Sequence, residues 1–255
     1  MPELFNLPTE ETLQRIADAQ EKLASRRVPI DFTGAPGSTY LLAGDTDAGF
    51  LGFVQSADFI TGDALTSDLA ITEGTSQNSD GAWIKYIWQG KICFTSLKTV
   101  RHSISWDAIH AAGAVYAAQD TQVVISGLTY IVRLFRGAAD DPTDSYADND
   151  RGSIGIENEW NAIILPLHER AKTQDWEYPE YAGDTEYWEV DLTDEDLRTH
   201  YDFGNGSRSW CQETNDVDGS ERLYRGNHGA SRLSASPSGY TGSLRGWRPV
   251  LELLG

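Results

Sequence analysis

Two pairs of apolar segments, each separated by two residues that end in glycine, constrain the fold of this sequence more than any other feature. Residues 83–88 (WIKYIW) and 91–97 (KICFTSL) flank Gln89-Gly90, and residues 121–125 (TQVVI) and 128–135 (LTYIVRLF) flank Ser126-Gly127. A two-residue loop with glycine is the connection that the tight primed turns of β-hairpins demand. Both pairs are therefore predicted to form antiparallel hairpins.

Short helices are predicted between and after these hairpins. Ser105 and Gly113 are placed as the N-cap and the stop of one short helix. Residues 157–171 (ENEWNAIILPLHERA) are typical of a helix that ends near Pro166, and Thr193 and Asp196 have the spacing of a capping box. With 8 Trp, 11 Tyr and 24 Gly, the composition favours strands and turns over a helical bundle. The last third, residues 204–255, is predicted to consist mainly of loops held by few strands.

The N-terminal region is predicted to be a single helix over residues 7–27. Thr9 can cap it and Pro29 ends it. Its apolar seam follows a and d heptad spacing with one polar gap, at Leu13, Ile16, Gln20 and Leu23. Two interpretations stand: a docking or trimerising helix, and an ordinary amphipathic helix that lies on the domain.

The charge of the chain argues against nucleic acid as a partner. The formal net charge is −19 and the isoelectric point is near 4.5, whereas nucleic-acid binding uses a basic face. No stretch approaches the roughly 20 apolar residues that span a bilayer, and residues 1–14 lack the pattern of a signal peptide. We therefore expect no membrane insertion and synthesis in a cytoplasm without export by a cleaved signal.

The sequence contains no recognisable catalytic pattern. Neither a Gly-x-Ser-x-Gly elbow nor a His-Glu-x-x-His helix is present. The five histidines are scattered along the sequence, which favours structural over catalytic roles for them. The two cysteines, Cys93 and Cys211, lie far apart and outside any Cys-x-x-Cys pattern, so a single disulfide between them is the only pairing left open. We expect a protein that is not an enzyme.

Acidic turns provide the candidate metal ligands. Asp148, Asp150 and Glu159 occupy positions 1, 3 and 12 of a calcium-loop count, but the glycine falls at position 5 instead of 6, so the loop is not an EF-hand. Asp216 and Asp218 offer a second run of oxygen ligands. Ca²⁺ is the one candidate cofactor, and solvated acidic turns are the competing interpretation.

A candidate recognition surface lies in the last third of the sequence. Tyrosine supplies contact area at low entropic cost, and neighbouring Ser, Gly and Asn adapt their hydrogen bonds, as in antibody paratopes. The competing interpretation is turn chemistry with buried aromatic packing. The candidate ligand-binding residues are Tyr224, Asn227, His228, Arg232 and Tyr240.

Residues 243–255 (SLRGWRPVLELLG) are predicted to form a final strand with both faces covered. Trp247 is expected to fill a core site, and Pro249 suits an edge or bulge because it has no amide donor. Arg245 and Arg248 bracket the tryptophan and are expected to pair with carboxylates. Eight residues are assigned structural roles: Trp160, Trp210, Arg225, Gly226, Gly246, Trp247, Arg248 and Pro249.

Six short sequence segments, four of which contain tryptophan, follow one another from residue 83 to the end and resemble a family of tailed-bacteriophage virion proteins. They are WIKYIWQGKICFTSLKTVRHSISWDAI, YIVRLFRG, NEWNAIILPLH, SWCQET, LYRG and GWRPVLEL. The resemblance implies a non-enzymatic virion structural protein, such as a fibre, collar, decoration or tail-tip component. It implies assembly in the host cytoplasm, association with copies of itself and with other virion proteins, and location in the virion.

The last third is also similar in style to the C-type-lectin-like fold of phage tropism determinants and of formylglycine-generating enzymes. This similarity implies an alternative function, binding of a host receptor or glycan during adsorption. The enzyme branch uses paired cysteines close in sequence, and only Cys211 lies in this region, so an enzyme of that type is the least favoured alternative. The expected fold class is α+β, with a C-type-lectin-like domain over residues 29–255. That domain is expected to have short antiparallel strands, few short helices, long loops and a β-rich part at 34–82, and to follow a docking or oligomerisation helix at 1–28.

Overall fold

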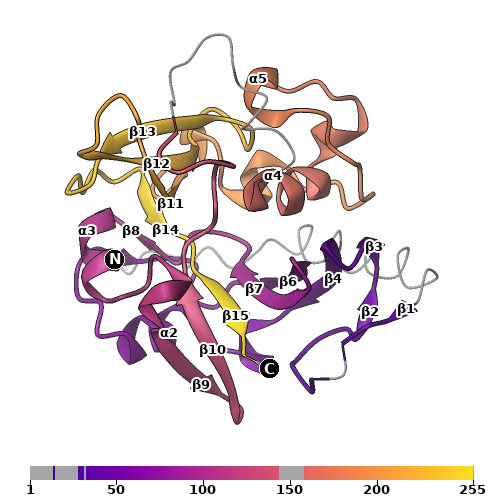
Figure 1. Cartoon of the computed structure of the whole chain (residues 1–255). Helices are drawn as coiled ribbons and strands as arrows, with labels where there is room; N and C mark the ends of the chain where they lie inside the picture. The colour runs from indigo at the N-terminus through magenta and orange to yellow at the C-terminus, as the bar shows by residue number, and fades with distance from the viewer. Residues whose placement is uncertain (1–13, 15–27, 32, 144–157, 255) are drawn as a thin grey trace.

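A computed structural model describes residues 14, 28–31, 33–143 and 158–254. Within these residues the strands form three sheets, of two, seven and six strands (Figure 1). The seven-stranded sheet, here the central sheet, has the order β3-β4-β6-β7-β15-β10-β9. The six-stranded sheet, here the upper sheet, has the order β13-β12-β11-β14-β8-β5. Between these strands every pairing is antiparallel except that of β11 with β14, so the fold is mixed α/β with mostly antiparallel sheets.

The strands are short. Those before residue 140 are β1 (Val28–Pro29), β2 (Tyr40–Leu41), β3 (Ala43–Gly44), β4 (Ala48–Val54), β5 (Thr75–Ser76), β6 (Trp83–Trp88), β7 (Lys91–Ser96), β8 (Arg101–His102), β9 (Gln122–Ile125) and β10 (Leu128–Arg133). The later ones are β11 (Arg208–Thr214), β12 (Glu221–Gly226), β13 (Leu233–Pro237), β14 (Arg245–Trp247) and β15 (Val250–Leu253).

The helices are also short. The α-helices are α2 (Gly62–Asp68), α3 (Trp106–Ala111), α4 (Glu159–Ile163), α5 (Pro179–Ala182) and α6 (Asp194–Leu197). The 3₁₀ turns are η1 (Ser56–Asp58), η2 (Ala117–Gln119), η4 (Leu165–Leu167), η5 (Glu169–Lys172) and η6 (Tyr201–Phe203). No helix among the described residues is long and apolar enough to cross a membrane.

Both predicted hairpins are confirmed. β6 pairs with β7 around Gln89 and Gly90, and β9 pairs with β10 around Ser126 and Gly127. All four turn residues have positive φ, between 50° and 85°, which is the signature of a type I′ turn. The glycine at the second position therefore allows the tight connection that the sequence indicated.

The predicted helix starts are confirmed as well. The Ser105 side chain caps α3 by accepting a hydrogen bond from the Ala108 amide, and Gly113 follows the helix with φ of +72°. Thr193 and Asp196 form the predicted capping box of α6. The helix expected up to Pro166 is α4, which is continued by η4.

The prediction for the last third is wrong, because this region carries five strands, β11 to β15, and supplies four of the six strands of the upper sheet. Its many turn residues lie in the connections between these strands. The turn-rich sequence therefore marks frequent reversals of the chain, and regular strands run between these reversals.

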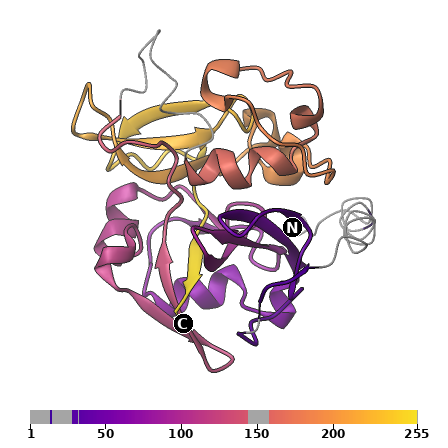
Figure 2. The same ribbon diagram turned by 45° about the vertical axis from the view of Figure 1, so that its right-hand side comes forward.

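The segment 245–253 crosses from one sheet to the other. β14 pairs with β11 and β8 in the upper sheet, and β15 lies between β7 and β10 in the middle of the central sheet (Figure 2). Pro249 lies in the crossing, outside both strands, so no ladder hydrogen bond is lost there. The expected single strand is therefore two strands, and the expected edge position is a crossing.

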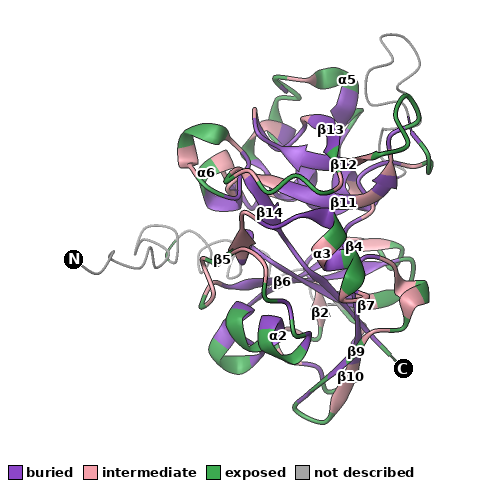
Figure 3. Cartoon of the chain, turned by 90° about the vertical axis from the view of Figure 1, so that its left-hand side faces the viewer, coloured by how far each residue is buried: buried purple, intermediate pink, exposed green. Residues whose placement is uncertain are grey.

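The core occupies both faces of the central sheet. Val250 belongs to one apolar cluster with Trp160 and Trp188, and Leu251 and Leu253 belong to another that includes Trp83. Both faces of β15 are thus covered, as predicted. Figure 3 shows the strands of both sheets mostly buried and the loops more exposed.

The N-terminal helix expected over residues 1–28 lies almost wholly outside the described residues. The part expected to be β-rich, 34–82, contains β2 to β5 together with α2. Its strands are divided among the three sheets: β3 and β4 belong to the central sheet, β5 to the upper sheet, and β2 pairs with β1.

Candidate functional site

Four of the five sequence-predicted ligand residues, Tyr224, Asn227, His228 and Arg232, lie in β12 or in its connection to β13, and Tyr240 lies in the connection from β13 to β14. The connection from β12 to β13 marks one end of the upper sheet. The start of β11 lies beside the end of β12, because Arg208 is opposite Gly226. The starts of β13 and β14 lie at the same end, since Leu233 is opposite Arg225 and Arg245 is opposite Arg208. We call the residues at this end, together with the side chains that contact them, the sheet-end surface: Tyr178, His200, Tyr201, Arg208, Tyr224, Asn227, His228, Arg232, Tyr240 and Arg245.

Arg208 connects the predicted residues to one another, and sequence reasoning missed it. Its Nε donates a hydrogen bond of 2.6 Å to Oδ1 of Asn227. Its guanidinium lies 5.4 Å from the ring centroid of Tyr224, a cation–π distance. The side chain is only partly buried, so a positioned cation is accessible to solvent. The only sequence signal was its place two residues before Trp210, which was assigned a structural role.

Arg245 is enclosed by aromatic rings. Its guanidinium carbon is 4.1 Å from the Tyr224 ring centroid, 5.2 Å from that of Tyr240 and 5.4 Å from that of Trp210. The residue is 3% exposed, and its Nε and Nη1 have no hydrogen-bond partner among the described residues. Burial lowers the pKa of Arg245 to about 10, which leaves it charged at neutral pH. The expected carboxylate partner is absent from the ion pairs of the described residues.

His228 and Arg232 contact a second group of rings. The His228 ring lies 5.0 Å from that of Tyr201 and 6.1 Å from that of Tyr178, and Arg232 lies 4.4 Å from the Tyr178 ring. Tyr201 is 44% exposed. Its amide donates to the carbonyl of Asn227, which joins this group to the Arg208 contact.

The five predicted residues therefore do not form one compact pocket. Tyr240 and Tyr224 contact Arg245, Asn227 holds Arg208, and His228 and Arg232 contact tyrosines from earlier in the chain. Tyr224 and Asn227 are themselves buried, whereas Tyr240 is 49% exposed. Ligand contact thus falls to Tyr240, Tyr201, His228, Arg232 and Arg208, with Tyr224 and Asn227 behind them.

A histidine–serine contact borders the sheet-end surface. Nδ1 of His102 lies 3.0 Å from Oγ of Ser103, and its Nε2 lies 3.5 Å from Nδ2 of Asn205. Burial, together with Arg198 and Arg101, lowers the pKa of His102. Within the described part of the chain no carboxylate contacts this imidazole, so the pair lacks the orienting acid of a serine hydrolase.

Glu159 does not fit the expected role of a Ca²⁺ ligand. Its carboxylate is fully buried and accepts hydrogen bonds from Nη1 and Nη2 of Arg133 at 2.7 and 2.8 Å, and from the Tyr86 hydroxyl at 2.9 Å. The carboxylate is therefore occupied by an ion pair. Asp148 and Asp150 lie outside the described residues.

The second acidic run, at Asp216 and Asp218, lies in the exposed loop between β11 and β12. Oδ1 of Asp218 accepts hydrogen bonds from the amide and hydroxyl of Ser220, which lower the pKa of Asp218. The described residues contain no group of three metal-ligating side chains.

Both cysteines are buried free thiols, so the disulfide left open by the sequence is not formed. Cys211 lies in β11, and burial raises the pKa of its thiol well above the ordinary value. A protonated, inaccessible thiol is a poor nucleophile.

The residues assigned structural roles lie in the interior. Trp160, Trp210 and Trp247 are fully buried. Arg225 and Arg248 are also fully buried and donate to carbonyl oxygens. Two glycines lie where the backbone approaches closely: Gly226 has φ of +93°, and a Cβ at Gly246 would lie 2.7 Å from the Thr99 side chain.

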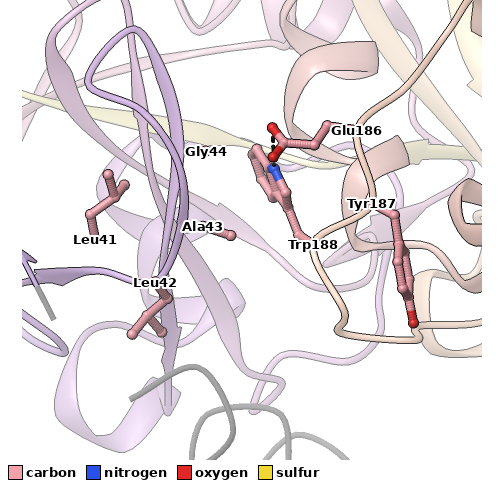
Figure 4. A pocket seen from close by; sticks show the side chains of 7 residues that line it. All are labelled: Leu41, Leu42, Ala43, Gly44, Glu186, Tyr187 and Trp188. Carbon is pink, nitrogen blue, oxygen red and sulfur yellow. Dashed lines mark hydrogen bonds between the residues drawn. The ribbon is translucent and has the colours of Figure 1, made fainter. Parts of the chain in front are cut away.

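Two hollows lie elsewhere on the molecule. One of about 250 Å³ is lined by 41–44 and 186–188 (Figure 4). Two aromatic residues line it. Trp188 is 3% exposed and donates to Glu186 at 3.1 Å, so its ring face is not free to stack on a ligand, and the Tyr187 hydroxyl donates to Asp191. The other, of about 580 Å³, is lined by the charged and polar residues Glu169, Arg170, Lys172, Thr173, Asp175 and Asp191. The sheet-end surface is the better candidate, because it combines exposed rings with a positioned cation.

Comparison of the chain with protein-family models, with curated proteins and with solved structures found no match.

Proposed function

We propose that this protein is a non-enzymatic structural component of a tailed-bacteriophage particle, present in several copies on its exterior. The sequence words that resemble phage virion proteins support this proposal. Many of these words form strands of the two large sheets, including β6, β7, β11 and β15, so the resemblance concerns the framework of the fold. The framework suits a displayed domain whose loops carry the variable chemistry.

The finer description of the fold as C-type-lectin-like belongs to the same proposal. Two features support it: the final strand β15 returns to the middle of the central sheet, and the connections at the end of the upper sheet carry the candidate ligand residues. Such an arrangement holds recognition loops on a closed framework.

A second function, binding to a host surface receptor or glycan during adsorption, is favoured by one observation. Tyr201 and Tyr240 are two of only five exposed large hydrophobic side chains among the described residues, and both lie on the sheet-end surface. Exposed tyrosines beside arginines are typical of recognition surfaces. This observation carries the binding function.

Two measurements test these functions separately. Mass spectrometry of purified particles should detect the chain, and its absence from the particle would overturn the structural proposal. Recombinant protein in excess should reduce adsorption of the phage to host cells, whereas Y201A should reduce adsorption much less. Adsorption that is unchanged by the wild-type protein would contradict the receptor-binding function and leave the structural one standing.

A third measurement tests the absence of catalysis. Because Ser103 lies next to a histidine, a fluorophosphonate probe is the most direct challenge. We expect no labelling of the folded protein. Labelling that S103A abolishes would overturn the non-enzymatic assignment.

A further inference from the structure

We infer that the sheet-end surface binds an anionic saccharide, with Arg208 as the residue that recognises its carboxylate or phosphate group. This inference rests on the proposed host-binding function and names its ligand class. The first step of the argument is the charge of the region. Arg208, Arg232 and Arg245 lie at one end of the upper sheet, and none of them takes part in an ion pair within the described ranges.

This local positive region contrasts with the net charge of −19 of the chain. At physiological ionic strength charges are screened beyond about 8 Å. A ligand that carries isolated negative groups therefore responds to the nearby arginines, whereas a long polyanion also meets the acidic remainder of the surface. An acidic saccharide with spaced charges fits this balance better than a nucleic acid.

The geometry of Arg208 suits an oxyanion. Asn227 holds Nε at 2.6 Å and the Tyr224 ring lies against the guanidinium. The two terminal nitrogens make no contact with a carboxylate among the described residues. A guanidinium fixed in this way keeps its terminal N–H groups for a bidentate contact, the geometry that carboxylate and phosphate groups accept.

The neighbouring rings suit the apolar face of a sugar. Tyr201 is 44% exposed, and its ring lies 4.3 Å from that of His200 and 5.0 Å from that of His228. The C–H groups of a pyranose ring form a flat apolar patch that packs on such aromatic surfaces, while tyrosine and histidine supply hydrogen bonds at their edges. Asp202 lies 3.4 Å from Nδ1 of His200, and this carboxylate can accept hydrogen bonds from sugar hydroxyls.

Calorimetric titration of the full chain at 0.15 M salt tests the inference with four probes: trigalacturonate, a phosphorylated mannan oligosaccharide, neutral maltotriose and a ten-residue oligothymidylate. We expect one of the two acidic saccharides to bind more tightly than maltotriose, and which of them binds better distinguishes carboxylate from phosphate recognition. R208Q should weaken that binding at least tenfold, and R208K, which keeps the charge without the bidentate fork, should weaken it less. K91Q is the matched control, because it removes one positive charge from the central sheet, and it should bind as the wild type does.

Three outcomes would overturn the inference: no binding of either acidic saccharide, equal binding by R208Q and wild type, or tighter binding of the oligothymidylate. Melting curves of R208Q that match those of the wild type exclude misfolding as the cause of weaker binding. If no acidic saccharide binds but the protein still blocks adsorption, the ligand class is wrong and the host-binding function stands. If the protein neither binds the probes nor blocks adsorption, the ligand class and the host-binding function are both wrong.

Discussion

The central and upper sheets differ in what contacts their buried cations. In the central sheet, Lys85 pairs with Asp31 at 2.6 Å, and Arg133 contacts both Glu159 and Glu252. Arg225 of the upper sheet donates only to carbonyl oxygens, and Arg245 lies among aromatic rings. One sheet neutralises its buried cations with carboxylates, whereas the other leaves its positive charge uncompensated by contact.

This difference explains where a ligand can bind. A cation already paired with a carboxylate has little attraction left for another anion, because the two charges cancel at short range. A cation that is held by carbonyl dipoles and aromatic rings is not neutralised, so it still attracts an anion. The upper sheet therefore supplies the positive region, and the central sheet supplies a framework whose charges are internally balanced.

Deletion of residues 247–255 should have the largest effect, because it removes parts of both sheets. It takes away Trp247 from the core and β15 from between β7 and β10. We expect loss of cooperative unfolding by circular dichroism. A truncated protein with an unchanged melting curve would contradict the assigned role of the crossing segment.

Arg133→Met should have the next largest effect. It leaves Glu159 buried without its cation and Glu252 with Lys91 alone, and removal of one partner of a buried ion pair typically costs about 3–5 kcal/mol. Urea unfolding measures this change. A loss below about 1 kcal/mol would show that the carboxylates do not depend on Arg133.

Arg248→Met should be less damaging, although Arg248 is equally buried. The substitution leaves the carbonyls of Leu97 and Leu197 without a donor, but it also removes an unpaired buried charge. We expect a net loss of about 1–3 kcal/mol in the same urea experiment. If this variant lost as much stability as Arg133→Met, the contrast between the two ways of holding charge would fail.

Glu213→Gln should change the pH dependence of stability. Burial raises the pKa of Glu213 to about 8, although the backbone amides of Gly137 and of Glu213 itself donate hydrogen bonds to the carboxylate. The folded state therefore holds the proton more tightly than the unfolded state. The contribution of Glu213 is full below about pH 4.5 and is lost as the pH rises through about 8.

Glutamine keeps the acceptor and removes the titration. Melting temperatures at pH 5, 7 and 9 should show the variant gaining on the wild type as the pH rises. Parallel curves for the two proteins would show that Glu213 does not titrate in this range.

Lys91→Gln should have the smallest effect. Lys91 pairs with Glu252, but its side chain is 57% exposed, and exposed pairs contribute about 0–1 kcal/mol. Urea unfolding should place the variant within about 1 kcal/mol of the wild type. A larger loss would mean that Arg133 alone does not hold Glu252.

Local elements of this fold could be predicted from the sequence, because their determinants are local. The glycines at 90 and 127 determine turns, and Ser105 and Thr193 mark helix starts through their own hydrogen bonds. The order of strands in the two sheets could not be predicted, because it depends on packing between distant segments. The crossing at Pro249 is an example, since proline excludes a ladder bond without indicating which sheet follows.

The candidate site was predictable only in part for the same reason. Tyr240 and His228 stood out as aromatic residues among turn residues. Arg208 and Tyr201 did not, because their role comes from register: Arg208 becomes a neighbour of Asn227 only when β11 pairs with β12. The expected pairing of Arg245 with carboxylates failed because strand pairing surrounds it with rings.

The position of β15 also has a consequence for synthesis on the ribosome. β7 and β10 are translated long before β15, which later lies between them. Until residue 253 has left the ribosome, these two strands have unpaired edges that face each other, and the sheet remains in two parts. Because domains generally fold as they emerge, the nascent chain must keep this gap open, and an interrupted translation product would expose both edges to other chains.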